Sequence, residues 1–253
     1  MTPRARLLVF IGACACVLPA AVDVVMHMPA FGVHPLPYGD AVNRLGTAER
    51  HVTNMVSLVN FDVRGFDTLG EEFMLLCAVT GVTILLRGAR GEQPTAEPGY
   101  APGRPDVRRS AAVTAIGRVF APLIVLFGFY VVLHAMTTPG GGFQGGVIMA
   151  SGCLLIWMGD GYRSWRQMMR TEILDAAEGF GASLYAAAGL APMVLGLPFL
   201  TNILPFGQPK DLLSGGLMLV LNAGVGFAVA GGFGVLFVEF LEETRAVPLG
   251  GGE

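Results

Sequence analysis

The sequence predicts an all-α, polytopic membrane protein with about six transmembrane helices. Hydrophobic residues make up 53% of the 253 residues and charged residues only 14%, whereas a soluble domain carries about 25% charged residues. The mean hydropathy is +0.60. Apolar runs of about 18 residues or more recur along the chain, and only helices satisfy their own backbone hydrogen bonds in lipid.

Six apolar runs are long enough to cross about 30 Å of hydrocarbon. They cover approximately residues 7–26, 69–87, 116–136, 143–161, 173–196 and 214–241. The first run follows Arg4 and Arg6, as in a signal peptide, but it continues past Asp23 to Met26, which is long for a signal core. We therefore expect this run to be retained as a span. A cleaved run would leave five helices and place one end of the chain outside.

Positive charge predicts the orientation, because arginine and lysine concentrate in cytoplasmic loops. With the N-terminus inside, 12 of the 16 basic residues lie in the cytoplasm. The four outside are Arg44, Arg50, Arg64 and Lys210. Both termini are thus predicted to be cytoplasmic.

Residues 91–112 separate two groups of spans. This stretch is rich in Pro, Gly and Arg and contains no apolar run, so it is predicted to be a flexible cytoplasmic linker. The sequence therefore predicts a two-helix unit at 1–90 and a four-helix unit at 113–253.

A glycine-rich stretch joins the third and fourth predicted spans. Pro139 blocks continuation of the third helix, and glycines allow a reversal with positive φ. One interpretation is a tight extracellular hairpin; the other adds exposed amides at a helix N-terminus beside an ion path. The residues of this hairpin are Pro139, Gly140, Gly141, Gly142, Phe143, Gly145 and Gly146.

Acidic residues precede the second span. Asp67 and Glu71 lie four apart, on one helical face, and Arg64 is placed to neutralise either of them. Glu71 is interpreted either as a partner of the helix dipole or as a group on an ion or proton route, which ionisable residues at membrane depth usually mark. The charged segment 47–68 around Arg64 is predicted to form a short helix at the membrane edge.

Other polar residues within the spans are fewer. His134 is interpreted as a capping or packing residue or as a proton relay, and Glu178 lies about two turns into the fifth span. Asn222 is predicted to form hydrogen bonds between helices. Two ridges of small residues on the sixth span are predicted to face neighbouring helices: Gly224, Ala228 and Gly232, and Gly226, Ala230 and Gly234.

Enzymatic chemistry has no support in the sequence. It contains no catalytic triad, no phosphate-binding loop and no metal-ligand helix, and no basic stripe typical of nucleic-acid binding. The four cysteines lie inside apolar runs without metal-site spacing. No metal, no cofactor and no nucleic-acid partner is therefore predicted, and the chain is not expected to be catalytic on its own.

Two stretches of the chain resemble a known family. Residues 113–253 resemble the B subunit of the Mrp-type multisubunit cation/proton antiporters, in the hairpin at 139–146 with His134 before it, in Glu178-Gly179, in the stretch 213–216, and in Asn222 with Gly226. Residues 1–90 resemble the C-terminal two-helix segment of the large A subunit, which related membrane-bound hydrogenases carry as a small separate subunit. That second resemblance rests on the stretch 64–71.

The resemblance implies a multi-pass subunit of a Na⁺/proton antiporter in the cell membrane, plasma or inner. Its partners would be large proton-channel-like subunits, small membrane subunits, lipid, Na⁺ and H⁺. In the family, the glutamate corresponding to Glu71 is implicated in the ion route, and a histidine corresponds to His134. A second histidine that the family often has two residues later is Met136 here, so a two-histidine relay is not predicted.

Two alternatives remain open. The same module occurs in ion-pumping membrane-bound hydrogenases and related respiratory oxidoreductases, and nothing in the chain distinguishes the two. A purely structural subunit, in which Glu71 and His134 only cap or pack, is the third interpretation.

Overall fold

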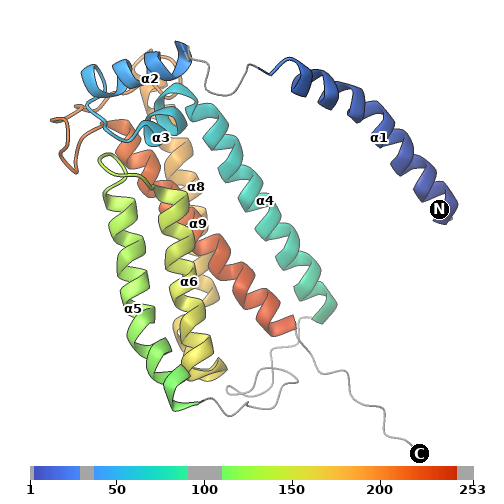
Figure 1. Ribbon diagram of the computed structural model, residues 1–253. Helices are drawn as coiled ribbons and strands as arrows, with labels where there is room; N and C mark the ends of the chain where they lie inside the picture. Colours follow the sequence, from blue (N-terminus) through green and yellow to red (C-terminus); the bar gives the residue numbers. More distant parts are fainter. Residues whose placement is uncertain (1–2, 29–36, 91–109, 244–253) are drawn as a thin grey trace, which may run out of the picture. The chain divides into compact units, whose positions relative to one another are not determined.

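The computed structural model describes residues 3–28, 37–90 and 110–243 (Figure 1). The chain forms two compact units, one up to Asp40 and one from Ala41 onward, and each is considered by itself. The regular elements formed by the described residues are all helices, and no strand occurs among them. The predicted linker 91–112 lies outside the described residues except for its last three.

The first unit contains α1 (Pro3–Met26), a single helix of 24 residues. Its stretch Arg4–Met26 is apolar enough to cross a membrane, with a mean hydropathy of 2.4. Large apolar side chains such as Leu8, Phe10 and Val17 are exposed along it. Exposure of this kind around a whole helix suits lipid rather than water.

The second unit holds the remaining elements (Figure 1). α2 (Pro37–Ala48) crosses the boundary between the two units and is followed by two short pieces, α3 (Met55–Leu58) and a π-helix, η1 (Val59–Val63). The long helices are α4 (Gly65–Arg90), α5 (Ala111–Leu133), α6 (Gly142–Asp160), α8 (Thr171–Val194) and α9 (Leu217–Glu243), with the short α7 (Tyr162–Met168) between α6 and α8. The predicted short helix within 47–68 is thus α3 with η1.

α9 lies at the centre of this unit and packs against α4, α6 and α8. Small residues bring the backbones together, because a methyl group on Gly181 of α8 would collide with the Gly224 carbonyl oxygen of α9. On another face of α9, Gly226 contacts Val132 of α5. Both predicted ridges therefore face other helices. α4 belongs to the same compact unit as α5–α9.

Five described helices have the length and apolar composition to cross a membrane: α1, α4, α5, α6 and α9. The predicted span 173–196 forms α8, which is 24 residues long. It falls short of these five in apolar character because it begins with Glu172, Asp175 and Glu178 and is rich in alanine and glycine. The chain is a polytopic, all-α membrane protein.

Candidate ion-path site

The buried face of α4 carries an acid. Thr68, Glu72 and Val79 are buried along this face, and Glu72 is only 1% exposed. Both carboxylate oxygens of Glu72 lack a hydrogen-bond partner among the described residues. An acid with neither a donor nor a counter-ion inside an apolar bundle is costly, and such residues usually serve transport.

A second buried acid comes from α8. Glu178 is 6% exposed, and its Oε1 also lacks a hydrogen-bond partner in the described part of the chain. A methyl group on Gly232 of α9 would lie 3.0 Å from this oxygen and 3.2 Å from Val79 of α4. Glycine at position 232 therefore leaves room for the carboxylate where α4, α8 and α9 meet.

The two acids belong to one electrostatic cluster. Glu72 lies within electrostatic range of both Glu71 and Glu178, and Glu178 lies within range of Asp175. None of the described residues forms an ion pair with Glu72 or Glu178. The cluster therefore gathers negative charge that a proton or a cation would neutralise.

Hydroxyl groups line the end of the cluster near the start of α4. Tyr185, fully buried on α8, donates a hydrogen bond from its hydroxyl to the Gly65 carbonyl oxygen (2.8 Å). Thr68 donates from its hydroxyl to the Asn60 carbonyl oxygen in η1 (2.7 Å). Since Tyr185 follows Glu178 by seven residues, both side chains lie on one face of α8. The polar groups from Gly65 to the level of Val79 extend over about 20 Å of α4.

Asp67 and Glu71, the two acids of α4 that were singled out in the sequence, lie on the exposed side of this helix. Arg64 donates from Nε to Oδ2 of Asp67 (2.6 Å), so the predicted neutralisation of Asp67 is present. Glu71 is exposed, on the face that also presents Asp67. The sequence does not identify Glu72 as the buried acid. Beyond its first turns α4 is apolar on all sides, so the spacing of its apolar residues does not show which side faces the bundle.

His134 lies apart from this cluster, one residue beyond the end of α5. Its ring stacks on Tyr130 with centroids 3.8 Å apart, and Nδ1 lies 2.9 Å from the Tyr130 carbonyl oxygen. These contacts of the imidazole ring are with α5 itself, a geometry that fits packing at a helix end.

The glycine hairpin is held by side chains from a distant segment. The Asn54 amide nitrogen lies 2.8 Å from the Ala135 and Thr138 carbonyl oxygens and 3.1 Å from that of Gly140. Ser57 donates its hydroxyl to the Ala135 carbonyl oxygen (2.7 Å). Asn54 and Ser57 are both buried, so the hairpin is an anchored turn.

Asn222 of α9 holds the other side of the same turn. It accepts from the Gly142 N–H (2.7 Å) and donates to the Val132 carbonyl oxygen (3.0 Å). The predicted hydrogen bonding of Asn222 between helices is confirmed. Gly140 and Gly141 have φ of 133° and 156°, which confirms the positive φ expected in this reversal.

The other glycines of the hairpin serve close packing. A methyl group on Gly142 would collide with the Asn222 carbonyl oxygen, and one on Gly145 would lie 2.7 Å from the Gly128 carbonyl oxygen. Gly146 likewise faces Val229 of α9. Phe143 packs against the main core, whereas Pro139 is exposed.

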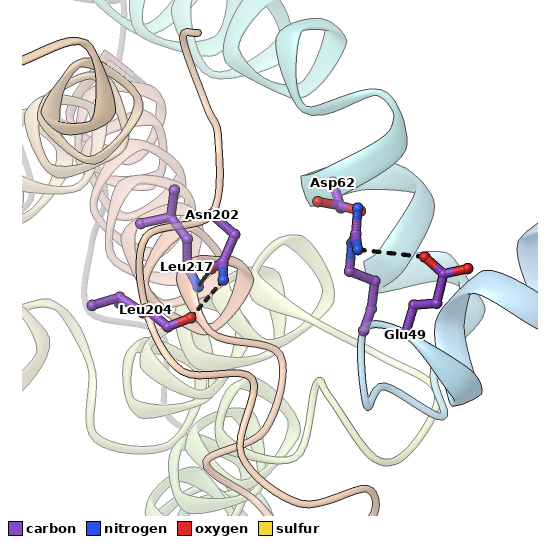
Figure 2. Close-up of polar contacts among 6 residues, drawn as sticks. Glu49, Asp62, Asn202, Leu204 and Leu217 are labelled. Atoms are coloured by element: carbon purple, nitrogen blue, oxygen red, sulfur yellow. Dashed lines mark hydrogen bonds and ion pairs between the residues drawn. The ribbon is translucent and has the colours of Figure 1, made fainter. Parts of the chain in front are cut away.

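An ion-paired layer covers the same end of the bundle. Arg50 pairs with Asp62 (Nε–Oδ2 2.8 Å) and lies 3.9 Å from Glu49. In the loop before α9, Asn202 donates to the Leu204 carbonyl oxygen and accepts from the Leu217 N–H, both at 2.5 Å (Figure 2). These paired groups order the surroundings of the site.

No group of three or more metal-ligating His, Cys, Asp or Glu side chains occurs among the described residues.

Sequence comparisons place this architecture among known proteins. Residues 112–235 match the family described as a domain related to the MnhB subunit of Na⁺/H⁺ antiporter. An uncharacterised protein of Methanocaldococcus jannaschii is 30% identical over 207 residues, covering 76% of this chain and 78% of that protein. The B subunit of the Na⁺/H⁺ antiporter of Bacillus subtilis is 34% identical over 86 residues, or 34% of this chain and 59% of that protein.

Two solved structures share the fold. A chain of the membrane-bound sulfane sulfur reductase, an archaeal respiratory membrane complex, matches with a TM-score of 0.72 and 25% identity over 94% of this chain and 98% of that chain. A chain of the Mrp complex from Dietzia sp. DQ12-45-1b matches with a TM-score of 0.68 and 24% identity over 98% of this chain but only 27% of that chain. The present chain therefore contains, at residues 112–235, a domain of the family related to the MnhB subunit of Na⁺/H⁺ antiporters.

Proposed function

We propose that this chain is a membrane subunit of a multisubunit cation/proton antiporter and that the interface of α4, α8 and α9 forms part of its ion path. The observation that carries the proposal is the burial of Glu72 and Glu178 in one cluster, with carboxylate oxygens that no described residue bonds. Relatives of this chain that are named as Na⁺/H⁺ antiporter subunits support a monovalent cation and the proton as the transported species.

The chemistry of the cluster suits exchange. Two buried carboxylates within electrostatic range repel each other, and a proton or a cation bound at either one relieves that repulsion. In this proposal Glu72 is the group that exchanges its proton, and Glu178 is the next binding group along the path. Glu178 lies at the level of Val79, about 10 Å further along α4 than Glu72. The hydroxyls of Thr68 and Tyr185 form the polar entrance at the other end.

Glu71 has a different part in this path. An ionised side chain facing lipid is costly, whereas one facing another protein is readily paired. The exposed Glu71 therefore marks the side of α4 that a partner protein covers, and there the path leaves this chain. This role keeps Glu71 and Asp67 on the ion route, but at the interface with that partner. The chain performs no other chemistry in this proposal.

The fused arrangement of the chain supports the same assignment. We propose that residues 1–90 correspond to the end of an A-type subunit and residues 113–253 to a B-type subunit. The Mrp chain matched by the structure contains a region equivalent to 98% of this chain within a single, much longer polypeptide. A fusion of the A-type segment and the B-type segment in one chain, as proposed here, is compatible with this match to a single Mrp polypeptide.

A second function is favoured by one comparison. The sulfane sulfur reductase chain matches almost over its full length, so the same fold occurs in a respiratory complex. In such a complex this chain would carry ions while redox chemistry takes place on other subunits. The identity of the copurifying subunits, determined by mass spectrometry of the tagged complex, decides between the two assemblies.

Charge-removing substitutions test the ion path directly. Glu72→Gln keeps the shape of the side chain and removes its ability to ionise, so cation-dependent proton flux in everted vesicles should fall at least about tenfold. Glu178→Gln should lower it as well. The amount of each subunit is measured in the same vesicles by blotting, so that flux is expressed per assembled complex.

Gly179→Ala, beside Glu178, is the matched control. A methyl group at this position meets no atom within 4 Å, so both flux and assembly should stay unchanged. Wild-type flux in assembled complexes carrying Glu72→Gln and Glu178→Gln together would overturn the path and leave a purely structural role as the interpretation.

A further inference from the structure

A groove runs along α5 and α6, away from the acidic cluster. It has a volume of about 630 Å³ and is lined mainly by apolar side chains, among them Val125, Leu126, Phe129 and Ile156. Both helices have the composition of membrane spans. The groove therefore lies at the depth of the hydrocarbon chains of the bilayer.

Charged groups occur at one end of this groove. Arg118 of α5 contacts Asp160 at the end of α6, with Nε and Oδ1 2.5 Å apart, and both residues line the groove. The Arg118 side chain is 66% exposed and that of Asp160 is 22% exposed. Both side chains are therefore accessible at this end of the groove, that of Arg118 more than that of Asp160.

Pro122 adds a third polar group at the same place. Proline has no N–H, so the carbonyl oxygen four residues earlier in a helix loses its usual donor. That carbonyl belongs to Arg118. Pro122 itself lines the groove, so a carbonyl oxygen that lacks its usual helical donor lies near the ion pair.

We propose that the groove binds a phospholipid with a zwitterionic, primary-amine headgroup, phosphatidylethanolamine. One acyl chain occupies the groove, the phosphate contacts the Arg118 guanidinium, and the ammonium donates to the Asp160 carboxylate and to the Arg118 carbonyl oxygen. A guanidinium and a carboxylate side by side match a headgroup that carries both charges. This site is independent of the ion path.

Charge complementarity excludes the other lipid classes as the preferred ligand. An anionic headgroup would meet the negative charge of Asp160 beside Arg118, and a quaternary choline headgroup has no N–H to donate. A protein helix is disfavoured because close helix packing in membranes uses small residues, whereas Leu126 and Phe129 are large and exposed here.

Native mass spectrometry of the purified, detergent-solubilised complex tests the site. Phosphatidylethanolamine, phosphatidylglycerol and phosphatidylcholine are titrated separately. Phosphatidylethanolamine should bind about tenfold more tightly than either of the others. Asp160→Asn should abolish the preference over phosphatidylglycerol, because the carboxylate that discriminates between them is gone.

Two tryptophan variants separate the groove from the general lipid surface. Leu126→Trp fills the groove and should lower phosphatidylethanolamine binding about tenfold. Leu123→Trp adds the same bulk to an exposed position of α5 that does not line the groove, so binding should be unchanged. Equal loss in both variants, or tighter binding of phosphatidylglycerol than of phosphatidylethanolamine, would overturn the proposal.

A photoreactive residue at position 126 of the intact complex identifies the occupant. Cross-linking to phosphatidylethanolamine is expected. A cross-link to another protein of the complex instead would show that a protein occupies the groove, and the lipid assignment would then be wrong.

Discussion

Two groups of buried polar side chains lie within the same helical unit and differ in how they are paired. Around the hairpin, Asn54 and Asn222 bond the backbone from two sides. Between α4, α8 and α9, the carboxylates of Glu72 and Glu178 have oxygens without such partners. Neutral groups that are fully bonded specify a structure, whereas ionisable groups left unpaired in a membrane protein point to transport.

The largest expected effect on stability comes from the paired group. Asn222→Ala leaves the buried Gly142 N–H without its partner and removes one of the donors to the Val132 carbonyl oxygen. An unpaired buried group costs about 1–3 kcal/mol. Thermal unfolding of the purified complex should shift to clearly lower temperature, with flux per remaining complex retained. Asn43→Ala, at an exposed position of α2, serves as the control and should change stability by less than about 0.5 kcal/mol. A stable Asn222→Ala complex without flux would place Asn222 in the ion path instead.

Backbone conformation at the hairpin gives the next effect. Gly141 has φ of 156°, and an added Cβ would lie 3.0 Å from Oδ1 of Asn222. Gly141→Ala should destabilise the complex by about 1–3 kcal/mol, and Gly141→Val should destabilise it more, because β-branching adds bulk next to Asn222. Unfolding midpoints of the two variants measure the difference. Equal midpoints for wild type and both variants would show that residue 141 is only a spacer.

Removing the unpaired acid Glu72 should raise the stability of the complex, whereas the two changes above lower it. Glu72→Leu replaces a carboxylate that has no bonded partner with an apolar side chain, which should raise stability by about 1 kcal/mol while abolishing flux. Gain of stability together with loss of transport in this one variant would show that the acidic cluster serves transport, in contrast to the hairpin, which serves stability. A marked fall in the unfolding midpoint would mean that Glu72 has a stabilising partner in the assembled complex.

The smallest effect is expected at the surface ion pair. Arg64 and Asp67 are largely exposed, with side chains 64% and 49% accessible, and such pairs contribute about 0–1 kcal/mol. Arg64→Gln should therefore barely alter the unfolding midpoint. Loss of more than about 2 kcal/mol would show that the partner protein proposed to lie at Asp67 excludes water from this pair, whereas the expected small effect means that the pair stays solvated at that interface.

The helices follow from the apolar runs, but their beginnings do not. Hydropathy predicts the second span from residue 69, whereas α4 starts at Gly65, because its first turn contains the charged Asp67. It predicts the third from residue 116, whereas α5 starts at Ala111 since the Ser110 hydroxyl accepts from the Val113 N–H. Polar first turns and caps are invisible to hydropathy.

The site is only partly predictable for a geometric reason. Adjacent residues on a helix point about 100° apart, so of Glu71 and Glu72 only one faces the bundle. The apolar residues around α4 do not indicate which. Glu178, in contrast, is predicted from its place in the chain and is buried. The contacts of Asn54 with the hairpin join residues more than 80 positions apart, for which one sequence contains no signal.

The contacts of Asn54 and Ser57 have a consequence for biogenesis. During translation these two side chains emerge long before residues 135–140, so their acceptors do not yet exist when α4 enters the membrane. The segment that holds Asn54 and Ser57 therefore acquires these hydrogen bonds only after α5 and the hairpin are inserted. A chain interrupted before that point leaves the polar groups of Asn54 and Ser57 without these partners.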